Sequence, residues 1–550
     1  MKRILGSLFI VLVALGIGSL AADAAETAQS TKDPVLRAML EELARSKAKL
    51  KLDDVAAPYY IEYSIGDVDE STVETAFGAL RIQNSNHARV LRVVVRVGSY
   101  KQDSYYGEGE GTVNIAAVED DIEALRRQLW LTTDRAYKTA GEALSQKQAA
   151  LKDKNVEIPV DDFAKVPPVE SILPLVKLEL DAKTWVETLE AASALYRRDP
   201  KVEEFDASLR AAAANRYFVN TEGSVVREGK TTFFLRVSGS TQAADGMRLD
   251  RDWNSVVTRP SELPSREKVL AKSGEVLASL KDLREAPIAD EDYRGPVLFS
   301  AGAAESIVDN LITRNALGQK AALGAPARTT GQWSAEYKSR VLPEFLSVKD
   351  DPTMTTYKDR TLVGNYTVDD EGVRAQRVSV VEKGKLVNYL IGREPIRDFP
   401  ESNGHGRGGL GRRPGPESGI LMVESSEPVP AAELKKKLIE LAKQHDLKYG
   451  YFVESMGGKS SPRVLRRVWV SDGHEELVRG GLFGELDTRS LRSDVIAAGD
   501  DLEASNRTGT ISQSIINPSL LFDELQVKRL DASKDKLPEY PAPALQVSAP

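Results

Sequence analysis

The chain is poor in the side chains that hold transition metals or act as nucleophiles. It contains no cysteine and only four histidines, His87, His405, His445 and His474. Zinc sites are built from imidazole, thiolate and carboxylate ligands, and in peptidases a carboxylate also deprotonates the attacking water. Without cysteine the chain has no disulfide framework, no thiolate ligand and no cysteine nucleophile.

His474 and Glu475 begin like the helical motif of zinc peptidases. That motif needs a second histidine at position 478, where this chain has Val478. The preceding residues, Ser471, Asp472 and Gly473, are typical of a turn. We therefore expect His474 and Glu475 at a solvated strand end rather than at a metal.

A glycine-rich segment, residues 404–416, places His405 beside Asn403 and Arg407. It follows no clear strand and lacks the Lys-Ser/Thr ending of a phosphate-binding loop, so we interpret it as a mobile loop. A flexible backbone could approach a peptide there. Asn403, His405 and Arg407 are the candidate substrate-binding residues, and an ordinary loop histidine is the alternative.

Three consecutive acids, Asp369, Asp370 and Glu371, could bind a hard cation. Gly372 follows directly, however, and a turn with solvated carboxylates is the simpler account. His445 lies near the end of a lysine-rich helical segment, where its charge suits the helix dipole. The sequence contains no serine-hydrolase or nucleotide-binding motif.

The elements that position these residues form two parts, which make an α+β fold. Residues 25–290 predict an N-terminal mixed α/β domain with antiparallel strands and long helices. Its expected strands are 59–65, 73–82 and 88–98 and a hairpin over 216–239. Its expected helices begin near residue 35, at Ile122, near Trp185 and after Ser265, the last with Ser265 as N-cap.

Residues 291–535 predict a β-rich C-terminal domain. Candidate strands cover 295–300, 361–368, 375–391, 419–426, 449–458, 463–481 and 520–530. Helical segments are expected directly after residue 300 and after Pro430. A proline-rich tail, 536–550, is expected to lie extended or disordered at the surface.

The N-terminus has the features of a signal peptide over residues 1–24. Lys2 and Arg3 precede an apolar run, and small residues that suit cleavage follow it. A membrane anchor is the alternative, but the run is short and contains glycines. We expect a periplasmic or secreted protein without stable membrane insertion. The net charge of −8, with no basic block, argues against a nucleic-acid partner.

Residues 368–395, with Asp-Asp-Glu-Gly followed by a hairpin at Glu-Lys-Gly, resemble the central signature of the TldD/PmbA family. Four further segments agree in the same order: 220–229, 295–307, 346–352 and 402–407. The resemblance implies an N-terminal α/β domain, a β-rich C-terminal domain, and homodimers or heterodimers with a TldD-like paralogue. It further implies an inner chamber that admits peptides or unfolded polypeptides.

Active family members are similar to metallopeptidases, with His-Glu-x-x-x-His on a helix and a distant cysteine. Aligned through residues 295–306, these motif positions fall on Val308, Asp309 and Thr313, and the cysteine is missing. The motif is degenerate, so we assign no catalytic and no metal-binding residue. We expect instead a helix that packs against a core through the side chains of Ala303, Ala304, Ile307, Val308 and Leu311.

Three functions remain open. The leading hypothesis is a non-catalytic family member that binds peptides or serves as the partner subunit of a metallopeptidase. The second is an active metallopeptidase that has rebuilt its site from residues such as His405, His474, Glu475 or Asp309, and only this one requires zinc. The third is a structural module of the cell envelope. The sequence leaves open whether the protein is an enzyme.

Overall fold

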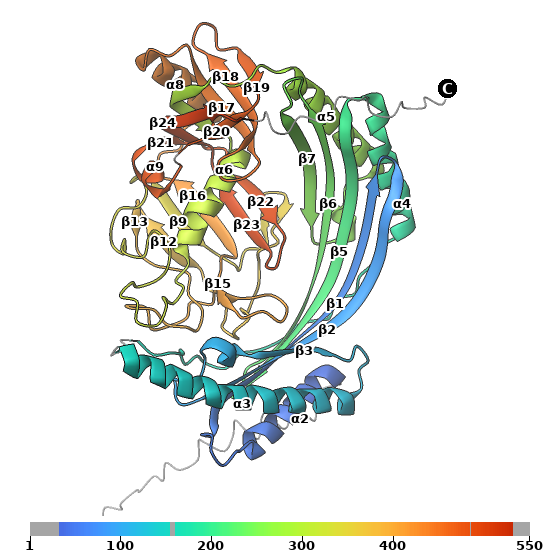
Figure 1. The fold of residues 1–550 in the computed structure, drawn as a ribbon, viewed down its shortest axis with the longest axis vertical. Helices are drawn as coiled ribbons and strands as arrows, with labels where there is room; N and C mark the ends of the chain where they lie inside the picture. Colours follow the sequence, from blue (N-terminus) through green and yellow to red (C-terminus); the bar gives the residue numbers. More distant parts are fainter. Residues whose placement is uncertain (1–31, 155–159, 485, 532–550) are drawn as a thin grey trace, which may run out of the picture.

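The computed structural model describes residues 32–154, 160–484 and 486–531 (Figure 1). The expected signal peptide and the proline-rich tail lie outside these residues. The chain folds as α+β, which confirms the predicted fold class: a curved N-terminal sheet lies along one side of a β-rich C-terminal half. Within the described residues, none of the helices is both long and apolar enough to span a membrane.

Four long strands dominate the N-terminal sheet: β1 (Pro58–Ala76), β2 (Ala79–Val97), β5 (Val202–Asn220) and β6 (Val225–Gln242). The sheet order is β3-β2-β1-β5-β6-β4, and β7 also pairs with β6. The shorter strands are β3 (Thr112–Ala116), β4 (Glu170–Ile172) and β7 (Arg248–Val257). All neighbours are antiparallel except β4 and β6.

The expectation of three strands between residues 59 and 98 is wrong, because β1 and β2 form one long hairpin. Its turn consists of Phe77 and Gly78, whose φ angles are +53° and +77°. Positive φ at both central residues suits a tight hairpin turn, but phenylalanine rarely adopts it and is no turn signal. The polar stretches that were expected to interrupt the strands are themselves strand, because neighbouring strands form hydrogen bonds with their backbone N–H and C=O groups.

Helices cover the sheet face that turns away from the C-terminal half. At one end α2 (Pro34–Lys49) and α3 (Ile122–Lys154) pack on β1 and β2. At the other end α4 (Ala182–Ser193) and α5 (Arg266–Glu285) pack on β5 and β6. The predicted helices are confirmed, and the Ser265 side chain caps α5 by accepting from the Lys268 N–H.

The C-terminal half contains two larger sheets. One has the order β19-β18-β17-β8-β24-β20, with β21 also paired to β24, and the other β13-β12-β9-β16-β23-β22. The strands of the first are β8 (Asp292–Phe299), β17 (Tyr449–Met456), β18 (Pro462–Trp469), β19 (Glu475–Val478), β20 (Gly481–Phe483), β21 (Val495–Ala498) and β24 (Leu520–Arg529). Those of the second are β9 (Leu346–Asp350), β12 (Val378–Glu382), β13 (Lys385–Leu386), β16 (Ile420–Ser425), β22 (Glu503–Arg507) and β23 (Gln513–Asn517).

A short helical path, α6 (Ala301–Ile307), η4 (Val308–Thr313) and α7 (Arg314–Ala316), contributes to the core that both sheets share. The predicted helix after Pro430 is α8 (Ala431–Gln444), which packs on β8 and β17. The remaining elements are short: the helix α9 (Thr488–Ser493) and the paired strands β10 (Thr356–Tyr357) with β11 (Arg360–Thr361). The predicted strand over 361–368 is therefore wrong except at its first residue.

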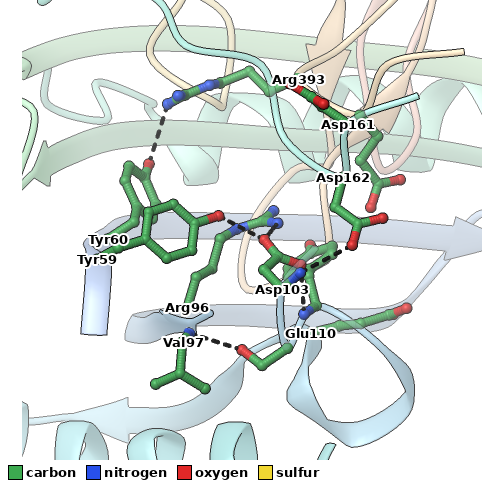
Figure 2. A network of polar contacts seen from close by, with 12 residues as sticks. Tyr59, Tyr60, Arg96, Val97, Asp103, Glu110, Asp161, Asp162 and Arg393 are labelled. Carbon is green, nitrogen blue, oxygen red and sulfur yellow. Dashed lines mark hydrogen bonds and ion pairs between the residues drawn. The ribbon is translucent and has the colours of Figure 1, made fainter. Parts of the chain in front are cut away.

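Buried polar side chains join the two halves. Figure 2 shows Tyr59 and Arg96 reaching Asp103, with Tyr59 Oη 2.6 Å and Arg96 Nη1 2.8 Å from Asp103 Oδ2. Arg393, from the C-terminal half, is fully buried and lies with Nη1 3.4 Å from the Tyr60 hydroxyl. Because removing one member of a buried ionic network leaves another unpaired, this seam favours a fixed arrangement of the halves.

Candidate functional site

The helix that corresponds to the expected motif contains a π-helical segment. Ser300 caps α6 through the N–H of Ala303, and the path changes to π-helix over Val308–Thr313. A π-helix closes its turns between residues five apart, so residues five apart lie on the same face. Val308 and Thr313, the two histidine positions of the motif, are therefore brought together although both have lost the imidazole.

The three motif positions have other partners. Val308 is fully buried in the core, as are the other members of the predicted packing face. The Thr313 hydroxyl donates to the Val308 carbonyl at 3.4 Å. Asp309 Oδ2 lies 2.5 Å from Arg507 Nη1 at the end of β22. The prediction of a packing helix with Ala303, Ala304, Ile307, Val308 and Leu311 turned inward is confirmed.

Acids surround this arginine. Glu305 Oε1 lies 3.4 Å from Arg507 Nη1. Burial raises the pKa of Glu305 while Arg507 opposes the rise, and burial together with Asp309 raises the pKa of Glu417. Burial alone would lower the pKa of Arg507, but Glu305 and Asp309 raise it above its usual value. The Arg507 guanidinium thus supplies the positive charge that Glu305 and Asp309 face, whereas Arg407 and Arg314 act on Glu417.

The residues do not fit the metal that the motif implies. At the two histidine positions of the motif stand the apolar side chain of Val308 and the hydroxyl of Thr313, which donates to the Val308 carbonyl. The remaining carboxylate, that of Asp309, is paired with Arg507. In the described part of the chain, no three His, Asp or Glu side chains gather so that they could hold a metal ion.

The turn at Asp369, Asp370 and Glu371 has buried carboxylates, so the expectation of solvated ones is wrong. Asp369 accepts from the N–H groups of Glu371 and Val373 through Oδ1, and from Gly406 N through Oδ2 at 2.9 Å. Asp369 has no exposed surface and Glu371 is 7% exposed. The turn itself is confirmed, with Gly372 at a φ of +80°.

These acids differ in protonation. Burial raises the pKa of Asp369 to about 6. Burial and the nearby Asp369 raise the pKa of Glu371 to about 8, although it accepts from the Arg393 N–H. Asp370 is the opposite case: burial acts to raise its pKa, but Arg407 and Arg216 hold it below the usual value. Burial and their mutual repulsion therefore favour retention of a proton on the Asp369–Glu371 pair.

The candidate residues Asn403, His405 and Arg407 lie in the strand and loop that wrap this turn. His405 is fully buried, with Nε2 3.2 Å from Asp350 Oδ1 and Nδ1 3.0 Å from the Asn403 carbonyl oxygen. The Asn403 side chain accepts from the N–H of Ile391 and donates to the Tyr389 carbonyl. In this structure His405 has no surface to offer a peptide.

Arg407 completes this cluster. Its guanidinium carbon lies 4.1 Å from the ring centroid of Tyr366, and Nε lies 3.5 Å from Asp370 Oδ2. The glycine-rich segment forms a small sheet from β14 (Gly406–Arg407) and β15 (Gly415–Pro416). Leu410 of this segment packs on Gly66 of β1. The contact is so close that a Cβ atom added to Gly66 would lie 1.5 Å from Leu410 Cδ2. In place of the expected mobile loop, the structure shows a hairpin that is held against β1 through Leu410.

The other histidines lie apart from both clusters. His474 is stacked on Trp469 with Nδ1 2.6 Å from Asp472, and Glu475 contacts Lys435, as expected for a strand end. His445 is the C-cap of α8. His87 lies on β2 with Nε2 2.5 Å from Asp67. The structure thus brings none of His405, His474, Glu475 and Asp309 to a common point.

A cavity of about 570 Å³ lies between the two halves, and none of the four histidines lines it. Its charged lining is largely paired: Lys147 and Lys320 both contact Asp162, and Arg413 contacts Glu110 and Glu394. A volume of this size accommodates a small ligand or a short peptide. Sequence reasoning missed this cavity, because its walls come from segments far apart in the chain.

Sequence reasoning also missed Asp350, Arg507 and the burial of Glu371. Asp350 lies in the segment 346–352 that carried part of the resemblance, which was the only available signal. Arg507 lies in no recognisable motif, and its pairing with Asp309 depends on tertiary structure.

A family model described as the PmbA/TldA metallopeptidase C-terminal domain matches residues 292–529. The matched region contains the helical path, Arg507 and the carboxylate turn. Over this region, a little under half of its length, the chain is similar to the TldD/PmbA family. The family resemblance noted in the sequence is thereby confirmed, and comparison with curated proteins gives no match.

Solved structures share the fold of this chain. A candidate modulator of DNA gyrase from Thermotoga maritima is 16% identical with a TM-score of 0.59, covering 89% of this chain and 99% of its own. TldE from Thermococcus kodakarensis is 11% identical with a TM-score of 0.58, at 89% and 99% coverage. A candidate modulator of DNA gyrase from Bacteroides thetaiotaomicron is 13% identical with a TM-score of 0.58, at 90% and 99%. At such identities the likeness concerns the fold alone.

Proposed function

We propose that this chain is an exported, catalytically inert TldD/PmbA protein that binds peptides and acts as a partner subunit. The observation that carries the proposal is the pairing of Asp309 with Arg507 beside Val308 and Thr313. A base for water activation must be free to accept a proton near a bound metal. Here the only carboxylate at the motif positions is paired with an arginine, and both imidazole ligands are absent.

The cavity between the halves supports the peptide-binding part of the proposal. It is separate from the motif helix, so ligand binding there does not depend on a metal site. Its rim, residues 321–327, is rich in alanine and contains a glycine, and small side chains leave room for an extended peptide. Its paired charges add polar groups that could orient such a ligand.

Metal analysis of the isolated full-length mature protein tests the proposal. After incubation with zinc and gel filtration we expect less than one tenth of a metal ion per chain, and no cleavage of unfolded polypeptide. A positive control with a histidine-bearing family member shows that the assay detects metal. One tightly held transition metal per chain together with chelator-sensitive peptidase activity would reject the proposal in favour of a rebuilt metallopeptidase.

A further inference from the structure

One group of side chains that lines the cavity between the two halves has a positive charge in excess. Lys147 and Lys320 share the carboxylate of Asp162, with their Nζ atoms 2.5 Å and 2.8 Å from its two oxygens. Burial acts to raise the pKa of Asp162, but the two lysines hold it below its usual value. Asp103, 3.8 Å from Lys147 Nζ, is already paired with Arg96 and leaves the balance unchanged. Lys147, Lys320 and Asp162 therefore form a cationic group.

A second group on the same cavity has a negative charge in excess. Arg413 binds two carboxylates: its Nη1 lies 2.6 Å from Glu110 Oε1, and its Nη2 lies 2.8 Å from both oxygens of Glu394. Burial acts to lower the pKa of Arg413, but Glu394 and Glu110 raise it above its usual value. Within the described chain no other basic side chain pairs with either glutamate. Glu110, Glu394 and Arg413 therefore form an anionic group.

The two groups stay separate although their charges are opposite. Among the residues that the structure describes, no ion pair joins a member of the cationic group to a member of the anionic group. Each group contains residues of both halves, so the cavity has its two excess charges only when the halves are packed together. Charges of opposite sign that line one cavity complement a ligand that carries both.

Both groups can form further hydrogen bonds. Lys320 Nζ donates to Asp162 Oδ1 and to the Asp161 carbonyl, which uses two of the three donors of an ammonium group. Glu110 Oε2 accepts no hydrogen bond from the described residues. The side chains of Lys320 and Glu110 are 28% and 30% exposed, so a ligand in the cavity can reach them.

The other charged residues of the lining do not alter this arrangement. Arg328 is paired with Asp398, with Nη2 2.7 Å from Oδ2. Arg397 is exposed, where solvent and salt screen its charge. The cationic and anionic groups are therefore the two places where a charge on an enclosed ligand would find a partner.

The cavity has the size of a short peptide. A sphere of about 570 Å³ is roughly 10 Å across, which is about the length of three extended residues. The rim, residues 321–327, contains only alanine, leucine, glycine and proline, so it offers no partner to a charged side chain of the ligand. The charges that the ligand needs are then those of its own two ends.

We propose that this cavity binds short peptides by their two free termini, with the α-carboxylate at the cationic group and the α-ammonium at the anionic group. The inference rests on the proposed function, whose peptide-binding cavity it uses, and adds that the ligand must be short and carry both terminal charges. Hydrogen bonds between charged groups are stronger than neutral ones, so the loss of either terminal charge should weaken binding.

Calorimetric titration of the full-length mature protein with trialanine tests the inference, because the two termini are the only charges of this peptide. Acetylation of the amine and amidation of the carboxylate should each weaken binding about tenfold, roughly the effect of losing one charge-assisted hydrogen bond. Equal affinity for free and capped trialanine would overturn the inference.

Two variants assign each terminus to its group. Lys320→Gln leaves Lys147 and Asp162 as a neutral pair, so the variant should bind the free carboxylate no better than the amide and should still prefer the free amine. Glu394→Gln should show the reverse pattern, because Glu110 and Arg413 then form a neutral pair. The preference that each variant retains shows that it is folded. Variants that keep both preferences, or that bind all forms equally, would contradict the assignment.

Lys437→Gln, on the exposed side of α8, removes the same charge outside the cavity and should leave every affinity unchanged. Unfolded polypeptide that binds where trialanine does not would overturn this inference and leave the proposed function standing. Failure of both ligands to bind would reject the peptide-binding part of the proposed function as well.

Discussion

Two buried acidic groups in the C-terminal half are stabilised in different ways. The carboxylate of Asp369 is held by backbone N–H groups from its own turn and from Gly406, deep inside the protein. The carboxylate of Asp309 is held by one side chain, Arg507, which is itself 43% exposed. Backbone contacts change only if the fold changes, whereas a side-chain contact can be lost in one substitution. The turn around Asp369 is therefore fixed by the fold, whereas the pairing at the motif helix depends on a single side chain.

The turn around Asp369 should tolerate substitution less well than the motif helix with its Asp309–Arg507 pair. A Cβ atom on Gly406 would meet Glu371 Oε2 at 2.0 Å, so Gly406→Ala must displace a buried carboxyl group. We expect this substitution to lower the free energy of unfolding by about 3 kcal/mol, as for other overpacked interiors. Urea denaturation measures the effect.

Gly415→Ala is the matched control, because Gly415 lies in the partner strand of the same small sheet and its added Cβ meets nothing within 4 Å. Equal stability losses in the two variants would contradict the view that the turn is rigidly filled.

Protonation of Glu371 should make the stability of the turn dependent on pH. Its folded pKa of about 8 exceeds the unfolded value of about 4.3, so the folded protein binds more protons between these pH values. The stabilising contribution is fully present below pH 4.3 and is lost as the pH rises through 8. The slope for one proton is at most about 1.4 kcal/mol per pH unit.

Glu371→Gln keeps a neutral group of the same shape, and its free energy of unfolding should depend less steeply on pH from 5 to 8. The comparison uses urea denaturation of both proteins at each pH. A variant with the same pH slope as the wild type would show that Glu371 is already ionised in the folded protein.

Substitution at the motif helix should have the smallest effect on the free energy of unfolding. Arg507→Ala leaves Asp309 without its cation, and since Arg507 is partly exposed to solvent we expect a loss of only about 1 kcal/mol. Arg507→Lys should retain part of this stability. Thermal unfolding at low and high salt is the measurement, and a loss as large as that of Gly406→Ala would erase the difference between the two groups.

The sequence predicted the parts of this fold that have strong local signals. The long helix from Ile122, the Ser265 cap and the packing face of α6 follow from apolar spacing and capping chemistry. Strand lengths in the N-terminal sheet did not, because Phe77 gives no turn signal and polar residues within β1 and β2 are held by their neighbours.

The candidate site shows the same limit. The family alignment together with residue types predicted that Val308 and Thr313 stand in place of the two histidines of the motif. The burial of Glu371 and His405, and the partners Arg507 and Asp350, arise from contacts between distant segments. Whether Asn403, His405 and Arg407 contact a substrate stays a prediction, although the burial of His405 argues for a structural part in this conformation.

The last strand of the described chain has a consequence for how the protein is made. β24 lies inside its sheet between β8 and β20, and residues 300–519 separate it from β8. Contacts so distant in sequence form slowly, and a nascent chain cannot form this one until β24 has been synthesised. A chain that terminates before residue 520 would keep β8 unpaired on one side, exposing an apolar strand to aggregation, so translation must pass β24 before the C-terminal half can close.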